Sequence, residues 1–154
     1  MPETGIKVVA TNRKARHTYF VLDTYEAGIS LRGTEIKSIR AGQISISQAY
    51  VSIDGDEAYL VNAHIAPYDQ ASRFNHDPLR TRKLLLHRSE IRRIGEDVRQ
   101  KGVTVIPLRI YLKDGLAKAE IATAKGKKLH DKRSDIAKRD AQREIDREIK
   151  VRGF

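Results

Sequence analysis

The stretch Gly126-Lys127-Lys128-Leu129-His130-Asp131-Lys132-Arg133 divides this chain of 154 residues into two unlike parts. Before it, apolar and polar residues alternate between turn signals, as in a small folded domain. After it, in residues 134–154, the few apolar side chains recur only at steps of four and five residues. A helix with so narrow an apolar stripe is marginal in water. We therefore expect a folded body over residues 1–124, and a basic hinge and tail over residues 125–154 that is disordered when free.

The charge of the chain indicates a polyanionic partner. Thirty Lys and Arg against twenty Asp and Glu give a net charge of +10, which favours RNA, DNA or an anionic lipid surface. The alternative is that the charge only keeps the protein soluble. The tail lacks the broad aromatic or leucine-rich face of a membrane-surface helix. The sequence has no cysteine and no long apolar run, so we expect a cytoplasmic protein without disulfides.

The body is predicted to consist of short antiparallel strands. Asp54-Gly55 and Asp114-Gly115 mark two hairpins, and Pro107 predicts an edge or a bulge in the strand over residues 104–113. In the strand predicted over residues 17–25, one face carries Phe20 and Leu22. The other face suits the outside of a barrel, where its rings could stack on bases or simply pack; it carries His17, Tyr19, Val21 and Tyr25.

Two helices interrupt the strands. Residues 34–42 have Thr34 as a possible cap and Gly42 as a stop, and residues 89–101 have Ser89 and Gly102 in the same roles. Five or six short strands with two or three inserted helices are typical of a closed oligonucleotide-binding barrel. We therefore predict a mainly β fold of this type.

Basic residues gather at three places in the sequence. Residues 11–17 form either an exposed loop or a segment that grips phosphates. Arg80, Arg82 and Lys83 precede three consecutive leucines, which would anchor them as a rigid positive patch, and the third cluster is the hinge. Glu26, an acid among these bases, is either part of a surface ion pair or a reader of a base amino group.

The sequence lacks the motifs of common enzymes. It has no glycine-rich phosphate loop, no histidine pair at metal-ligand spacing and no nucleophile motif. Asp54, Asp56 and Glu57 lack the spacing of a calcium loop and are typical of a polar hairpin tip. We expect no cofactor, no metal and no catalytic residue, and hence not an enzyme.

Five stretches, in this order and at this spacing, together resemble the family of small protein B, the SsrA-binding protein that partners transfer-messenger RNA (tmRNA) in bacterial ribosome rescue. The resemblance extends over about residues 6–136. It rests on residues 12–17 (NRKARH), 25–28 (YEAG), 35–42 (EIKSIRAG), 77–86 (DPLRTRKLLL) and 124–133 (AKGKKLHDKR). Many relatives also carry a tryptophan near the position of Ala141, which this chain lacks.

The resemblance implies an oligonucleotide-binding barrel that grips the tRNA-like domain of tmRNA and replaces its missing anticodon stem. The tail would enter the decoding centre and the vacant messenger channel of a stalled ribosome, and become helical there. A monomer would act with tmRNA, the ribosome with its small-subunit RNA and, through the tmRNA complex, elongation factor Tu. The main alternative is a general single-stranded RNA-binding protein or a ribosome accessory protein.

The residues expected at each contact follow from this resemblance and from the basic clusters. The tmRNA-binding residues would be Asn12, Arg13, Lys14, Arg16, His17, Glu26, Lys37, Arg80, Arg82, Lys83, Leu85 and His87. The ribosome-binding residues would be Lys125, Lys127, Lys128, His130, Asp131, Lys132, Arg133 and Ile149.

Overall fold

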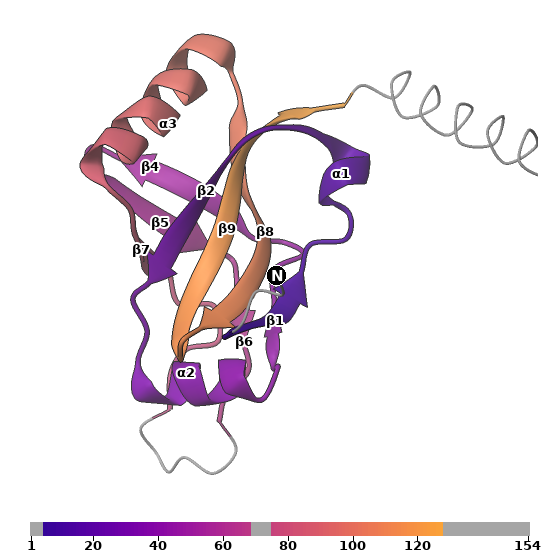
Figure 1. The fold of residues 1–154 in the computed structure, drawn as a ribbon, viewed down its shortest axis with the longest axis vertical. Helices are drawn as coiled ribbons and strands as arrows, with labels where there is room; N and C mark the ends of the chain where they lie inside the picture. Colours follow the sequence, from indigo (N-terminus) through magenta and orange to yellow (C-terminus); the bar gives the residue numbers. More distant parts are fainter. Residues whose placement is uncertain (1–4, 69–74, 128–154) are drawn as a thin grey trace, which may run out of the picture.

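The computed structural model describes residues 5–68 and 75–127, and strands dominate this part of the chain. In chain order the elements are β1 (Ile6–Thr11), α1 (Ala15–Thr18), β2 (Tyr19–Ile29), α2 (Gly33–Arg40), β3 (Ile44–Ser45), β4 (Tyr50–Asp54), β5 (Glu57–Val61), β6 (His64–Ile65), β7 (Arg82–Leu85), α3 (Arg88–Lys101), β8 (Thr104–Lys113) and β9 (Leu116–Gly126). Figure 1 shows the long strands β2, β8 and β9 side by side, with α1, α2 and α3 at three different places around them.

The strands form a curled seven-stranded sheet and a separate short pair. The order in the large sheet is β1-β8-β9-β2-β7-β5-β4, every pair is antiparallel, and β3 pairs with β6. Register shifts in β1, β2 and β8 bend the strands. The shift in β8 lies between Pro107 and Arg109, which confirms the bulge predicted at Pro107. Both predicted hairpins are also found, as β4–β5 and β8–β9.

The closed barrel predicted from the sequence is not found in the described residues. There, β1 and β4 end the sheet and each pairs with only one neighbour. β4 lies close to β8, and β1 lies close to the two-residue strand β3, but neither contact is a hydrogen-bonded strand pair. The coarser prediction, a mainly β fold with inserted helices, is confirmed.

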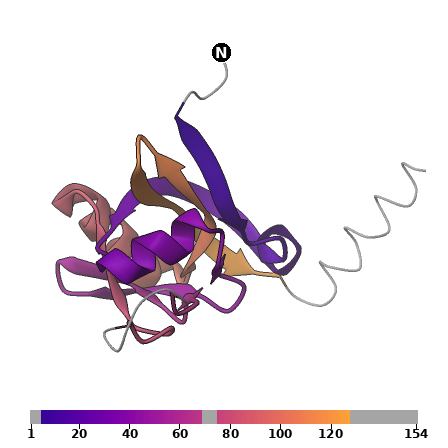
Figure 2. The same cartoon turned by 90° about the horizontal axis from the view of Figure 1, so that it is seen from below.

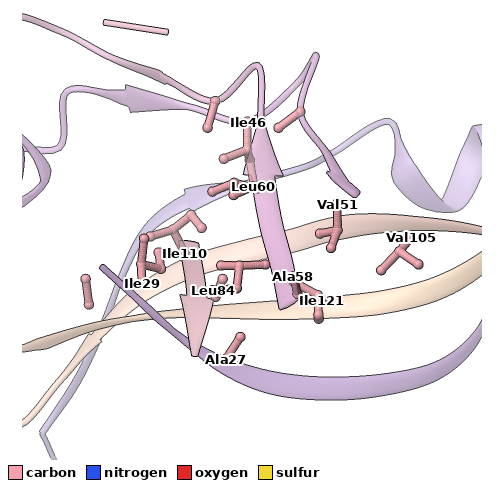
Figure 3. Close-up of a cluster of buried hydrophobic side chains, with 14 of the residues drawn as sticks. Ala27, Ile29, Ile46, Val51, Ala58, Leu60, Leu84, Val105, Ile110 and Ile121 are labelled. Carbon is pink, nitrogen blue, oxygen red and sulfur yellow. The ribbon is translucent and has the colours of Figure 1, made fainter. Parts of the chain in front are cut away.

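The main core lies on the concave side of the sheet. Leu60, Leu84, Ile110 and Ile121, from four different strands, are at most 1% exposed, and Figure 3 shows these side chains gathered between the strands. The helices add to this core, with Ile39 of α2 and with Ile91 and Ile94 of α3. This apolar interior fixes the curvature of the sheet, and so the shape of its outer face.

A second, smaller cluster lies on the opposite face of β8 and β9, beneath α1. It contains Ala15, Ile106, Leu108, Ala122 and Ala124, with Tyr19 and Val21 packed against it. The helix α1 takes up residues 15–18, so residues 17 and 18 are helical where the start of a strand was predicted, and Ala15 of this helix packs near Tyr19 and Val21 of β2. The face of β2 predicted to lie outside is therefore partly covered, whereas Phe20 and Leu22 are 43% and 50% exposed.

Candidate nucleic-acid interface

Two residues, Asn12 and Ala15, hold the basic segment of residues 12–17 to the body. The backbone N–H of Asn12 donates a hydrogen bond to the carbonyl of Leu108 at 2.8 Å. Its side-chain Nδ2 donates to the carbonyl of Pro107 at 3.1 Å. Ala15, 3% exposed, places its methyl group in the small cluster. Asn12 is among the expected tmRNA contacts, and the donor group of its side-chain amide is used to hold the segment to β8.

This anchoring leaves the charged side chains of the segment outside. Arg13, Lys14, Arg16 and His17 are all exposed. One helical turn, closed by the bond from Thr18 N–H to the Lys14 carbonyl at 3.0 Å, thus presents three cations and an imidazole at one corner of the molecule. Figures 1 and 2 both show α1 at this corner, on the opposite side of the molecule from α3.

Two surface pockets flank the basic segment. One, of about 350 Å³, lies between the segment and the strands β8 and β9, and its lining includes Arg13, Arg16, Leu108, Arg109 and Glu120. The other, of about 230 Å³, faces the start of β2 and β4, and its lining includes Lys14, Thr18, Tyr19, Gln48 and Tyr50. The basic residues therefore stand beside hollows that combine apolar and polar groups, as single-stranded RNA requires.

Two rows of side chains cross the outer face of the sheet toward this segment. Residues that oppose each other in a strand pair share a face. The first row is Leu85, Gly28, Lys118 and Tyr111, and the second is Glu26, Glu120 and Arg109. The expected contacts Glu26 and Leu85, distant in the sequence from residues 12–17, are thus joined to them by one continuous surface.

Glu26 is held in its charged form within this surface. Tyr111 donates its hydroxyl hydrogen to Glu26 Oε2, and Lys113 Nζ lies 3.6 Å from the same oxygen. The hydrogen bond from Tyr111, with the positive charge of Lys113, lowers the pKa of Glu26 despite partial burial. Its side chain remains 43% exposed. Glu26 is therefore part of a surface ion pair, which was the first of the two alternatives for this residue. Its exposed carboxylate can still accept a hydrogen bond from a ligand.

Leu85 places an exposed apolar side chain in the same surface. It is 56% exposed and lies over Gly28, where an added Cβ would be 3.3 Å from the Leu85 Cβ. A glycine at this position lets the leucine lie close to the sheet. His87, two residues further on, is exposed at the N-terminal cap of α3, and its backbone N–H donates to Glu90 Oε1 at 3.1 Å.

Arg82 does not lie in the surface, which corrects the predicted positive patch. Its side chain is fully buried, with Nε donating to Glu35 Oε2 at 2.6 Å and Nη1 donating to the Ala63 carbonyl at 2.7 Å. Arg80, 26% exposed, donates from Nη2 to Glu35 Oε1 at 2.5 Å. Strand β7 turns alternate side chains inward, which directs Arg82 to the buried carboxylate, whereas Arg80 reaches the same carboxylate from the loop before β7. Arg82 thus supports the fold from inside.

The other predicted tmRNA contacts lie away from α1. Lys83 points outward from β7 and pairs with Glu57 at 3.3 Å. Lys37 is exposed on α2, with Nζ 5.5 Å from the centre of the Tyr68 ring. In Figure 1, α2 lies at the far end of the sheet from α1. Lys37 and residues 12–17 therefore do not share one flat surface for a ligand.

The root of the tail lies next to the basic segment. Lys127 donates its backbone N–H to the carbonyl of Thr18 at 2.9 Å, and its Nζ lies 4.9 Å from the centre of the Phe20 ring. Lys125 is exposed and opposes Phe20 across the β2–β9 pair. The predicted ribosome contacts Lys128, His130, Asp131, Lys132, Arg133 and Ile149, and the predicted order of the tail, lie outside the described residues.

Several residues of this surface were not predicted. Arg109, Tyr111, Lys118 and Glu120 form most of the outer rows, and Lys113 pairs with Glu26 beside them. The alternation of residues 104–113 and 116–121 placed them on one face, but nothing in a single strand shows that this face adjoins residues 12–17. Within residues 5–68 and 75–127 we found no cluster of potential metal ligands, and no helix long and apolar enough to cross a membrane.

Comparisons with known proteins agree over nearly the whole chain. The family model described as SmpB protein matches residues 9–151. An SsrA-binding protein from Pelotomaculum thermopropionicum is 55% identical over 148 residues, which cover 96% of this chain and 97% of that protein. An SsrA-binding protein from Desulforudis audaxviator is 58% identical over 141 residues, 92% of each chain.

A solved structure is similar as well. It is described as "tmRNA-SmpB: a journey to the center of the bacterial ribosome", and its matching chain is 45% identical to this one with a TM-score of 0.68. The match covers 86% of this chain and 95% of that chain.

Proposed function

Since this chain belongs to the SmpB protein family, we propose that it binds the tRNA-like domain of tmRNA and acts with it on the ribosome in trans-translation. Its relatives are SsrA-binding proteins, and the similar solved structure is of a tmRNA-SmpB complex described in the context of the bacterial ribosome. In this role it delivers tmRNA to stalled ribosomes whose messenger channel is vacant, and takes the place of the missing anticodon stem. The role is one of binding rather than catalysis.

The observation that carries this function is the pinned basic segment. A short helix held to the sheet by Asn12 and Ala15 presents Arg13, Lys14 and Arg16 to solvent. Cations on a fixed backbone bind phosphates at a smaller cost in conformational entropy than cations on a free loop. We propose that this segment, with Glu26 and Leu85 on the adjoining outer face, contacts tmRNA.

We further propose a division of labour between the two parts of the chain. The body, residues 1–124, holds tmRNA, and residues 125–154 contact the decoding centre and messenger channel. Support comes from the position of Lys125 and Lys127, which leave the body beside α1. The curled sheet also supports an architecture related to the oligonucleotide-binding barrel, although the described strands leave it open.

The experiment that tests tmRNA binding compares two triple variants of equal charge. Arg13→Gln/Lys14→Gln/Arg16→Gln removes three cations from α1 and its loop. The control changes three exposed arginines of α3, on the opposite side of the molecule: Arg92→Gln/Arg99→Gln/Arg93→Gln. Affinity for the isolated tRNA-like domain is measured over a series of salt concentrations.

Loss of phosphate contacts lowers both the affinity and its salt dependence. We expect the α1 variant to bind at least ~10-fold more weakly, with a shallower salt slope, and the α3 variant to stay within ~3-fold of the unchanged protein. Equal losses in the two variants would mean that only net charge matters.

The alternative, a general single-stranded RNA-binding or ribosome accessory protein, makes a different prediction. Its affinity would be similar for the tRNA-like domain and for unstructured RNA of equal length. A preference of the unchanged chain for the tRNA-like domain over such an RNA, at the same salt concentration, separates the two functions.

A further inference from the structure

The pocket between α1 and the strands β8 and β9 has the features of a site for one unstacked nucleotide. Its volume of about 350 Å³ falls in the range of small-molecule sites. Its floor includes the apolar side chains of Ala15 and Leu108, both buried in the small cluster. The exposed Arg13 and Arg16 stand on one side of it and the partly exposed Arg109 and Glu120 on the other.

Arg109 is oriented to donate hydrogen bonds into the pocket. Its guanidinium carbon lies 4.8 Å from the centre of the Tyr111 ring, and its Nε donates to Glu120 Oε2 at 3.1 Å. These two contacts orient a planar guanidinium at the wall of the pocket. A guanidinium held in this way can donate to the edge of an unpaired RNA base.

Glu120 supplies the complementary acceptor. The ion pair with Arg109 places a carboxylate and a guanidinium side by side, each about 30% exposed: 29% for Glu120 and 30% for Arg109. Guanine presents an acceptor, O6, next to the donors N1–H and N2–H on its Watson–Crick edge. A guanidinium can donate to the first while a carboxylate accepts from the other two. Only guanine offers two adjacent donors to one carboxylate on this edge.

We propose that this pocket binds an unstacked guanine nucleotide of RNA, with the base against Arg109 and Glu120 and the phosphate toward Arg13 and Arg16. The inference rests on the proposed function for the presence of RNA. It adds two residues, Arg109 and Glu120, to the binding surface and gives them the role of selecting the base. The guanine comes either from tmRNA or from ribosomal RNA, and the two sources share this chemistry.

The first test uses the unchanged full-length chain and two mononucleotides. Guanosine 5′-monophosphate and inosine 5′-monophosphate differ only in the N2 amino group. In amide NMR titrations we expect the guanine nucleotide to shift the signals of Ala15, Arg109 and Glu120, and the inosine nucleotide to bind ~5-fold more weakly, as loss of one hydrogen bond implies. Equal binding of the two, or shifts confined to other parts of the chain, would overturn base selection by Glu120.

The second test keeps the net charge constant. The variant Arg109→Gln/Glu120→Gln removes one cation and one anion from the pocket, and Arg92→Gln/Glu96→Gln does the same on the exposed face of α3. Both are assayed for binding to the tRNA-like domain and to ribosomes, with melting temperatures measured to compare their folding.

We expect the pocket variant to lose at least ~10-fold in affinity for one of the two RNAs, because the hydrogen bonds to the base edge from both side chains are lost together, and the α3 variant to lose none. Loss for the tRNA-like domain alone assigns the guanine to tmRNA, and loss for ribosomes alone assigns it to ribosomal RNA. If neither affinity changes, the pocket inference is wrong while the proposed function stands. If the unchanged chain does not prefer the tRNA-like domain over unstructured RNA, the proposed function itself fails.

Discussion

Replacing Glu35 with glutamine should strongly destabilise the body of the protein. Glu35 is fully buried and accepts hydrogen bonds from Arg80, Arg82 and the backbone N–H of Arg32. Glutamine has nearly the same shape but no charge, so it would leave the buried guanidinium of Arg82 without a counterion. Removing one partner of a buried ion pair typically costs about 3–5 kcal/mol.

The pKa of Glu35 gives an independent magnitude. Burial alone raises the pKa of this carboxyl, but the hydrogen bonds from Arg80, from the Arg32 backbone and from Arg82 outweigh it and lower the pKa from 4.5 to about 2. A displacement of this size corresponds to about 3 kcal/mol. Because the folded-state pKa lies below the unfolded-state value, this stabilisation is present above pH 4.5 and is lost as the pH falls toward 2. About 2 kcal/mol of it should be gone by pH 3.

The assay is urea unfolding followed by circular dichroism at several pH values between 7 and 3. At pH 7 we expect Glu35→Gln to unfold with a free energy about 3 kcal/mol below that of the unchanged protein, a loss of about 10 °C in melting temperature. The difference between the two proteins should shrink by about 2 kcal/mol at pH 3, since the unchanged protein then loses the contribution too.

Two further variants sharpen the result. Glu96→Gln, on the exposed face of α3, serves as the charge-matched control and should change stability by less than about 1 kcal/mol. Glu35→Leu/Arg82→Met replaces both fully buried charges, and should be more stable than Glu35→Gln because the only cation left without its partner is Arg80, which is 26% exposed. The reasoning is refuted if Glu35→Gln is as stable as the control, or if its stability difference does not depend on pH.

Three other changes test the interface. Asn12→Ala removes the hydrogen bond to the Pro107 carbonyl and should cost about 1 kcal/mol in stability and weaken binding to the tRNA-like domain; unchanged binding by this variant would show that the pin is dispensable. Gly28→Ala places a Cβ 3.3 Å from that of Leu85, so it should displace the leucine and weaken RNA binding. Adding Leu85→Ala to the Gly28→Ala variant should not restore RNA binding if the leucine itself contacts RNA. Removal of residues 126–154 should leave affinity for the tRNA-like domain within ~3-fold of the full chain and abolish peptide tagging on stalled ribosomes; loss of RNA binding on truncation would contradict the division of labour.

Local sequence patterns predicted the elements whose signals are local. Asp54-Gly55 and Asp114-Gly115 predicted both hairpins, and Gly102 predicted the end of α3. The N-terminal cap of this helix was misplaced by two residues, since His87 and not Ser89 is its N-cap. Turn chemistry and helical periodicity depend on near neighbours, so a sequence reports them directly.

Features that depend on distant partners were not predictable in this way. Arg82 is buried because Glu35, 47 residues away, meets it inside the fold. Phe20 is exposed because α1 covers the other face of β2, although alternation alone could not say which face would be covered. The barrel was predicted from the number of strands, but closure depends on pairing between β1 and β4 at the two edges, which no single strand encodes.

The same dependence explains the candidate site. Residues 12–17 could be singled out because their charges lie close together, Glu26 because it is an acid among bases, and Leu85 through the family resemblance. Arg109 and Glu120 carry no such signal, because their ion pair and the pocket beside it exist only after β8 and β9 have paired and α1 has docked on them.

Besides the bonds of its own single turn, the helix α1 is held by the Ala15 methyl group, by the backbone and side-chain amides of Asn12, and by the hydrogen bond from Lys127 to the Thr18 carbonyl. The free energy needed to open so small a unit lies far below that of global unfolding. Its amide hydrogens should therefore exchange with solvent well before those of β8 and β9. An RNA that requires the closed form binds with an affinity reduced by the fraction of molecules that are open. Substitutions that merely stiffen this turn would then tighten RNA binding without touching the RNA.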